Sequence, residues 1–162
     1  MTLPKLALIA TPEKTMYQRI LVPTDGSALS KKAVNSAIEQ AAASGAELVA
    51  LYVVPRYPMS YFEGGIPVSN SEVARTEKQW ADKGQAVVDE VQKAAEAGGV
   101  KAKGVLARSD LVAESVISAA RKHKCDLIVM ASHGRKGIKR VLLGSETQHV
   151  LTHSKLPVLV LR

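Results

Sequence analysis

Cysteine, aromatic residues and long apolar runs are all scarce in this chain of 162 residues. Cys125 is the single cysteine, which excludes an internal disulfide bond and a zinc site built from several thiolates. Because it lies just before an apolar run, we expect it to be a small, buried and unreactive thiol. Aromatic residues make up only 4% of the chain, so Ala, Val, Leu and Ile must fill the core.

No apolar run approaches the roughly 20 residues that a membrane-spanning helix requires, so we expect no membrane partner. Residues 1–12 lack the charged start, the long apolar centre and the cleavage site of a secretion signal. We therefore expect a cytoplasmic protein.

Positive charge exceeds negative charge, with 22 Lys and Arg against 15 Asp and Glu and a net charge of +7. Such an excess fits a nucleic acid, an acidic membrane surface or a small polyanion as partner. The sequence offers few aromatic residues for base stacking and no recognisable nucleic-acid module, so we do not expect nucleic acid. Helical patterns carry many of the basic residues, but four gather in one loop: Arg135, Lys136, Lys139 and Arg140.

Five short runs rich in Val, Ile and Leu predict strands that are covered on both faces. Four helical patterns separate these runs, so strand and helix alternate along the chain. The alternation predicts right-handed βαβ units and an α/β fold, a three-layer doubly wound sandwich with a parallel sheet between helices. The predicted strands are Arg19–Thr24, Leu48–Val54, Lys101–Ala107, Leu127–Ala131 and Pro157–Leu161.

We expect residues 1–15 to form an N-terminal extension and residues 16–162 to form a single domain. The second helical pattern is opened by Ser69-Asn-Ser-Glu72 and closed by Gly98-Gly99. Before it, Pro55–Ser69 carries three prolines and two adjacent glycines, which predicts a loop.

The run from Ile128 to Gln148 carries the strongest functional signal. A predicted buried strand ends at Ala131, a loop rich in glycine and basic residues follows, and Gly144-Ser145 opens a helix. Backbone N–H groups in such a loop and at a helix start make a site for phosphate. Ser145-Glu-Thr-Gln148 matches a capping box, which predicts Ser145 as the cap of this helix. The run therefore indicates nucleotide binding.

Thr24 ends the first predicted strand and Asp25 follows it, within Val22-Pro-Thr-Asp-Gly-Ser27. In a doubly wound sheet, ligands bind beyond the carboxyl ends of the strands, where the strand order reverses. A carboxylate there would bond a ribose or an adenine edge, or hold a Mg²⁺ ion whose other ligands are phosphate oxygens. Alternatively, Asp-Gly-Ser is ordinary strand-to-helix punctuation, with Asp25 as a turn residue and helix cap.

Two further residues carry weaker signals. Val53, in the second predicted strand, fits either an apolar contact to adenine or the core. His133 has neither a Ser/His/Asp arrangement nor metal-ligand spacing around it, so we expect it to organise its loop. The chain also has no Gly-x-x-x-x-Gly-Lys-Ser/Thr loop and no Gly-x-Gly-x-x-Gly after its first strand. It therefore lacks the machinery of a fast phosphoryl-transfer enzyme.

Four segments together resemble the universal stress protein family, and the resemblance runs from Tyr17 to Arg162. It implies five parallel strands in the order 3-2-1-4-5. It also implies a homodimer through the last strand, Pro157–Leu161, an apolar edge that pairing with a second copy would cover. The segments are Val22-Pro-Thr-Asp-Gly-Ser27, Asp126-Leu-Ile-Val-Met-Ala-Ser-His-Gly134, Leu142-Leu-Gly-Ser145 and Leu156-Pro-Val-Leu-Val160.

The ATP-binding branch of that family carries the motif Gly, two residues, Gly, nine residues, Gly, then Ser or Thr. This chain has Gly134, Gly144 and Ser145 with the nine-residue gap intact, but Ala131 stands at the first glycine position. The added methyl group would crowd the base or the ribose. If the backbone keeps an ordinary strand conformation there, alanine costs little.

The same resemblance implies an ATP site, possible Mg²⁺ included, in which each end of the nucleotide has its own residues. The ribose and adenine end would comprise Pro23, Thr24 and Asp25, with Val53 and Met130 as adenine walls. The phosphate end would comprise Gly134, Gly144, Ser145 and Glu146, with Thr147 one step further into the helix and Ala131 and His133 in the preceding segment. On electrostatic grounds, Arg135 and Lys136 would screen the γ-phosphate.

The predicted function is that of an ATP-binding, dimeric regulatory or stress-response sensor with at most slow ATP hydrolysis. Its nucleotide state would bias binding to an unidentified regulatory protein. The alternative is a nucleotide-free member of the family that acts as a protein-interaction module, and Ala131 favours it. An enzyme of the ATP-pyrophosphatase or adenylylating type would carry Ser-Gly-Gly-x-Asp-Ser after the first strand, and Thr24-Asp-Gly-Ser27 lacks that loop.

Overall fold

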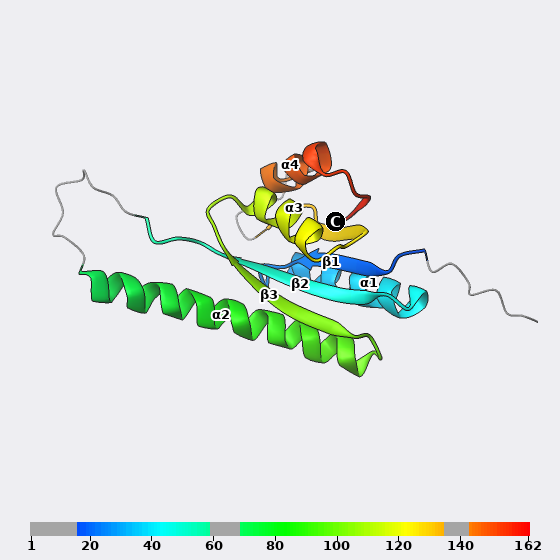
Figure 1. The fold of residues 1–162 in the computed structure, drawn as a ribbon, viewed down its shortest axis with the longest axis horizontal. Helices are drawn as coiled ribbons and strands as arrows, with labels where there is room; N and C mark the ends of the chain where they lie inside the picture. The colour runs from blue at the N-terminus through cyan, green and yellow to red at the C-terminus, as the bar shows by residue number, and fades with distance from the viewer. Residues whose placement is uncertain (1–15, 59–68, 135–142) are drawn as a thin grey trace, which may run out of the picture.

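The computed structural model describes residues 16–58, 69–134 and 143–162, which contain one five-stranded sheet in the order β3-β2-β1-β4-β5. Neighbouring strands are parallel throughout, which confirms the predicted fold class and strand order (Figure 1). The expected extension 1–15, and residues 59–68 of the expected loop, lie outside the described residues. The strands are β1 (Arg19–Pro23), β2 (Glu47–Val54), β3 (Ala102–Arg108), β4 (Leu127–Ala131) and β5 (Val158–Leu161).

Helices cover both faces of this sheet (Figure 1). On one face lie α1 (Ala28–Ser44) and α2 (Asn70–Ala97), and on the other lie α3 (Val112–Lys122) and α4 (Ser145–His153). Successive side chains of a strand point to opposite faces, so each strand serves both layers of the core. In β1, Ile20 and Val22 pack towards α1 and α2, whereas Leu21 packs towards α3 and α4, and all three are fully buried.

Serine residues begin the two longest helices. The Oγ of Ser27 accepts the N–H of Ser30 at the start of α1, at 3.2 Å. Ser69 and Glu72 form a complete capping box at the start of α2, in which each side chain bonds the other residue's backbone N–H. Both side chains satisfy N–H groups that the first turn of a helix leaves without a partner.

The predicted capping box at the last helix is wrong. The cap of α4 is Gly144 and not Ser145, and the described side chains supply no cap hydrogen bond there. The N–H of Gly144 donates to the carbonyl of Ser132 at 2.7 Å, and its own carbonyl accepts the N–H of Gln148 at 3.0 Å. Because these two bonds fix Gly144 in the extended cap conformation, Ser145 already lies inside the first turn.

Helix α2 approaches β2 and β3 very closely. A Cβ atom built on Gly84 of α2 would lie 2.7 Å from Cδ1 of Tyr52, and one on Gly104 of β3 would lie 2.8 Å from Cγ2 of Val88. Real Cβ atoms do not tolerate such distances, so the absence of a side chain at both positions sets the spacing of this layer.

Cys125 lies in the core on the α3–α4 side, with 6% of its surface exposed. Burial raises the pKa of its thiol to about 11. The expectation of an unreactive thiol therefore agrees with its environment. Among the described residues, no helix combines the length and the apolar character needed to cross a membrane.

Gly104→Ala is expected to lower the free energy of unfolding by about 1–3 kcal/mol, because the new methyl group overpacks Val88. Urea denaturation followed by circular dichroism measures the loss. Val88→Ala also destabilises, by removing buried methyl groups, but in the double variant the methyl at 104 has room. The double variant should therefore lose less than the sum of the two single losses, and strict additivity would contradict the contact.

Candidate functional site

The carboxyl ends of β1, β2 and β4 meet where the strand order reverses. From β1 the sheet grows outward through β2 and β3 on one side and through β4 and β5 on the other, so the reversal lies between β1 and β4. Strand β2 continues beyond β1, because Pro23 pairs with Leu51 and the N–H of Thr24 donates to the Leu51 carbonyl at 2.9 Å. Val53 therefore lies past the last paired residue of β1, at the end of the sheet where the strand order reverses.

The hydroxyl group of Thr24 organises the turn from β1 into α1. Its Oγ1 lies 3.0 Å from the Oγ of Ser30 and accepts the N–H of Gly26 at 3.2 Å. Gly26 has a φ of 76°, a conformation that favours glycine. These contacts leave Thr24 buried, with 7% of its surface exposed, directly behind Asp25.

Asp25 joins this turn to the segment that follows β4. Its Oδ1 accepts the N–H of Ser27 at 2.9 Å, so the carboxylate has the predicted turn role, while Ser27 and not Asp25 caps α1. A Cβ atom on Gly134 would lie only 2.8 Å from Oδ2 of Asp25. Glycine at this position therefore leaves space for the carboxylate.

The apolar residues assigned to the adenine walls share one face of the sheet. Val53 and Met130 both pack in the cluster beneath α3 and α4. Ala131 follows Met130 in β4, so its methyl group points to the opposite face, where α1 and α2 lie. Ala131 is 8% exposed, lies within the strand, and is not among the residues with positive φ. Its methyl group therefore does not project between Val53 and Met130.

Backbone hydrogen bonds hold Ser132, the first residue after β4, in place. Ser132 is 2% exposed, its N–H donates to the Leu161 carbonyl at 2.7 Å, and its carbonyl accepts the N–H of Gly144. Its hydroxyl oxygen lies 3.1 Å from Nδ1 of His133, and the rest of the loop that this histidine is expected to organise lies outside the described residues. Sequence reasoning assigned no role to Ser132, although this residue holds the start of α4 against the end of β4.

The amino end of α4 opens at the same place. Ser145 is exposed at the first helical position, and the described side chains supply no cap for the N–H groups of this turn. Thr147 is turned inward, 2% exposed, and its Oγ1 donates to the Ala131 carbonyl at 3.0 Å. The structure thus brings Pro23, Thr24, Asp25, Gly134, Gly144 and Ser145 to one end of the sheet, whereas Arg135 lies outside the described residues.

The side chain of Glu146 bonds the neighbouring helix, α3. Its Oε2 accepts the N–H of Ala113 at 2.8 Å, in the first turn of α3. Leu111 is the cap residue of α3 and provides no side-chain acceptor, so Glu146 supplies the acceptor from across the interface. This role has no local sequence signal, because the two residues lie 33 positions apart.

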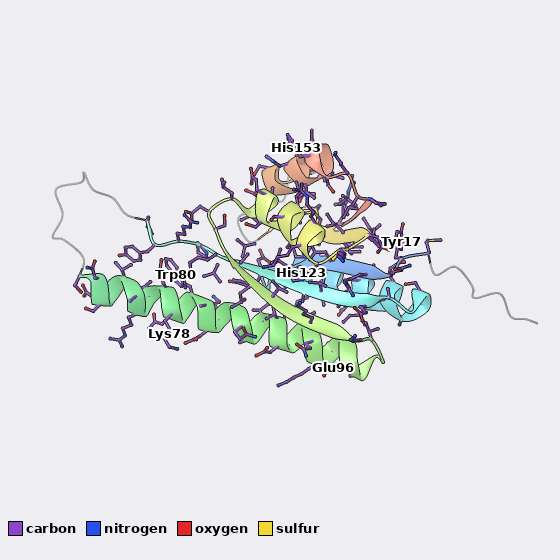
Figure 2. The ribbon with its side chains drawn as sticks, viewed as in Figure 1. Tyr17, Lys78, Trp80, Glu96, His123 and His153 are labelled. Atoms are coloured by element: carbon purple, nitrogen blue, oxygen red, sulfur yellow. The ribbon has the colours of Figure 1, made fainter. Side chains whose placement is uncertain are left out.

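A second set of contacts anchors the start of α2 near this end of the sheet. The rings of Tyr57 and Trp80 stack with centroids 6.1 Å apart, and Figure 2 shows Trp80 on α2 near the segment that follows β2. Glu77 accepts the N–H of Tyr57 at 3.3 Å and pairs with Arg108 at 2.7 Å. The alternation of apolar and polar residues did not predict these contacts, because they depend on the tertiary position of α2.

Among the described residues, no group of three or more His, Cys, Asp or Glu side chains is placed to hold a metal ion. A Mg²⁺ ion near Asp25 would therefore depend on phosphate oxygens for its other ligands.

Glu146→Ala is expected to lower the free energy of unfolding by about 1 kcal/mol, because the first turn of α3 loses the side-chain acceptor that bonds the N–H of Ala113. Thermal or urea denaturation measures the loss. Gln148→Ala, at an exposed position on the same helix, is the matched control and should have almost no effect. Equal stability of the two variants would show that the contact with Ala113 contributes nothing.

Comparison with known proteins gives the same family from three directions. The model of the universal stress protein family matches residues 16–162. Universal stress protein MJ0531 of Methanocaldococcus jannaschii is 36% identical over 149 residues, which are 92% of this chain and 84% of the relative.

Two solved structures have the same fold along nearly their whole length. UspA from Lactobacillus plantarum has a TM-score of 0.76 at 26% identity, and the match covers 90% of this chain and 98% of that one. A universal stress protein solved in complex with cAMP has a TM-score of 0.66 at 28% identity, with 90% and 97% covered. Family model, sequence relative and fold agree, and the chain belongs to the universal stress protein family.

Proposed function

We propose that this protein binds ATP at the carboxyl ends of β1 and β4 and acts as a regulatory sensor. The observation that carries the proposal is the amino end of α4. Serines cap α1 and α2, but α4 begins with Gly144, and the described side chains leave its first N–H groups without a cap. Such an end, at the point where the strand order reverses, favours a phosphate group.

The crevice offers different chemistry at its two ends. The backbone N–H of Ser145 would bind the phosphates, with Gly134 and Gly144 allowing close approach of the backbone, since the N–H of Gly144 already bonds the Ser132 carbonyl. Asp25 and Pro23 would contact the ribose and adenine, and Val53 and Met130 would cover the adenine face. In this proposal Mg²⁺ is held by the phosphates with Asp25, and Arg135 supports the γ-phosphate.

Ala131 does not count against this arrangement. The methyl group lies on the face covered by α1 and α2, opposite Val53 and Met130, and the backbone is that of an ordinary strand. Alanine in place of the first motif glycine would therefore crowd the nucleotide little. A related protein that is 28% identical was solved in complex with cAMP, which supports an adenine nucleotide as the ligand class.

Glu146 and Thr147 take supporting roles in the proposal. Their side chains already bond Ala113 and Ala131, respectively, so only their backbone N–H groups would face a phosphate. The contact from Glu146 to α3 would carry a change at the nucleotide to the surface of that helix. Binding of a regulatory protein there would depend on the nucleotide, with at most slow hydrolysis and in the cytoplasm.

A nucleotide-free interaction module is the second candidate, and one observation favours it. The carboxylate of Glu146 lies in the first turn of α4, where a negative charge already stabilises the helix dipole. A ligand phosphate would then be partly redundant.

Two experiments distinguish the ATP-binding sensor from the nucleotide-free module. Freshly purified protein is denatured and the released small molecules are separated by chromatography, and the protein is titrated with Mg-ATP in a calorimeter. Released ATP or ADP, or a saturable titration, supports the nucleotide sensor. Empty protein that does not titrate overturns the ATP proposal and leaves the interaction module.

Gly144→Val is expected to weaken ATP binding at least about tenfold, roughly 1.4 kcal/mol, because its side chain stands where phosphate approaches. A Cβ there meets its nearest neighbours, in Ser132 and His133, at 3.4 Å, so the fold should persist. Gly98→Val, with the same 3.4 Å clearance at the end of α2, is the matched control. Unchanged affinity of a folded Gly144→Val protein would remove the phosphate assignment.

The proposal includes a homodimer through β5. This strand is an edge of the sheet, and all four of its residues are only partly buried. Pro157 and Leu161 use their carbonyl groups to bond β4. Because bonding alternates along a parallel strand, Val158 and Val160 turn their backbone groups outward, where a second copy would pair with them.

Val160→Pro is expected to convert the dimer to monomer, because proline removes an outward N–H without breaking a bond to β4. Light scattering after size-exclusion chromatography measures the mass. Val160→Ala is the matched control, since it loses side-chain contact but keeps the N–H, and it should stay dimeric. A dimeric Val160→Pro protein would place the interface elsewhere. This design avoids a charge at Leu159, whose side chain packs against the core.

A further inference from the structure

A cavity of about 200 Å³ lies at the end of the sheet opposite the proposed nucleotide site. It is formed by the amino ends of β1, β2 and β3 and by His123, which follows α3, and Figure 2 shows His123 where that helix ends against the sheet. Leu48 and Val49 contribute apolar surface, and four charged side chains complete the wall: Arg19, Glu47, Lys101 and Lys103.

The polar groups of this cavity form one continuous chain of contacts across three strands. Oε2 of Glu47 accepts Nε of Arg19 at 3.0 Å and Nη2 at 2.6 Å, and Oε1 accepts the ammonium group of Lys101 at 2.6 Å. The remaining guanidinium nitrogen, Nη1 of Arg19, donates to the His123 carbonyl at 2.8 Å. Arg19 is thereby fixed in place.

Lys103 and the ring of His123 form a further contact in the wall of the cavity. The ammonium nitrogen of Lys103 lies 3.4 Å from Nδ1 of His123, a contact that only a neutral ring can accept. Lys103 is the cation of this cavity for which the described residues provide no carboxylate.

The charges around the cavity do not balance. Arg19, Lys101 and Lys103 face the single carboxylate of Glu47, whose pKa is lowered by its hydrogen bonds with Lys101 and Arg19, so it remains ionised. Asp126 is also near Arg19, but its carboxylate accepts the backbone N–H groups of Gln18 and Arg19. The lining groups therefore carry a net positive charge, three cations against one anion.

Burial, followed by the positive charges of Lys103, Lys122 and Arg19, lowers the pKa of His123. Protonation of this ring would add a fourth positive charge beside Lys103. An anion in the cavity would favour protonation of His123, because the protonated ring and the ammonium group of Lys103 could then both donate hydrogen bonds to it.

We infer that this cavity is a second ligand site that takes a small oxyanion, the phosphate or carboxylate group of a small molecule, against the adjacent ammonium group of Lys103 and ring of His123. Arg19 and Lys101 supply the surrounding positive field, and Glu47 keeps the guanidinium group in position. The cavity is several times larger than the space that one water molecule requires, so such a group fits with part of its hydration shell.

Proton NMR of the four histidine rings tests the site, with inorganic phosphate added at constant ionic strength. We expect the His123 resonance to shift saturably and its pKa to rise. His133 reports on the proposed nucleotide site, so phosphate bound there is distinguished from phosphate bound in the cavity. A His123 signal that does not respond to phosphate or to succinate overturns the proposal. A response to only one of them identifies the preferred oxyanion.

Lys103→Met should weaken phosphate binding at His123 about tenfold, the loss of one charge-assisted hydrogen bond. Lys93→Met, at an exposed position on α2, is the matched control and should leave the affinity unchanged. Sulfate, which stays doubly charged throughout, should bind more tightly as the pH falls through the pKa of His123. If both lysine variants weakened phosphate binding equally, the loss would come from the lower overall charge and not from a local contact, which would overturn the proposal.

Discussion

Parallel pairing of β1 with both β2 and β4 is the constraint on which the rest of the molecule depends. The pairing brings the carboxyl ends of these three strands to the same end of the sheet, although their residues are far apart in the sequence. Each strand then delivers a loop to the same place: the Asp25 turn, the segment after Val54 and the segment from Ser132 to Gly134. β1 can hold this central position because Ile20, Leu21 and Val22 are fully buried on its two faces.

The polar side chains at the carboxyl ends of β1 and β4 mainly stabilise the fold. Thr24, Glu146 and Thr147 bond other parts of the chain, and Ser132 holds the start of α4 through its carbonyl. Among the described residues, the groups left over are mostly the backbone N–H groups of the first turn of α4, from Ser145 onward, because the N–H of Gly144 already bonds the Ser132 carbonyl. In the proposed function these N–H groups would recognise phosphate by shape and dipole, which requires few charged side chains.

The sequence predicts the strands to within one residue at each end, because buried parallel strands read as continuous apolar runs. That the segments after β1 and β4 meet at one end of the sheet also follows from the sequence, since connections in such sheets are strongly restricted. The cap of α4 was predicted wrongly, because the decisive bond comes from the Ser132 carbonyl and not from a local motif. The bond from Glu146 to Ala113 and the chain of contacts around His123 join residues distant in sequence, so local patterns carry no trace of them.

The position of Cys125 limits how this protein meets oxidising conditions. It is the single cysteine, so a covalent link between two copies would have to form through its sulfur. Attack on an oxidant or a disulfide requires the thiolate, and a pKa of about 11 leaves almost none of it at neutral pH, behind a wall of core side chains. Oxidants would thus react only slowly with this sulfur while the chain stays folded, and the proposed dimer would depend on backbone pairing and packing rather than on a crosslink.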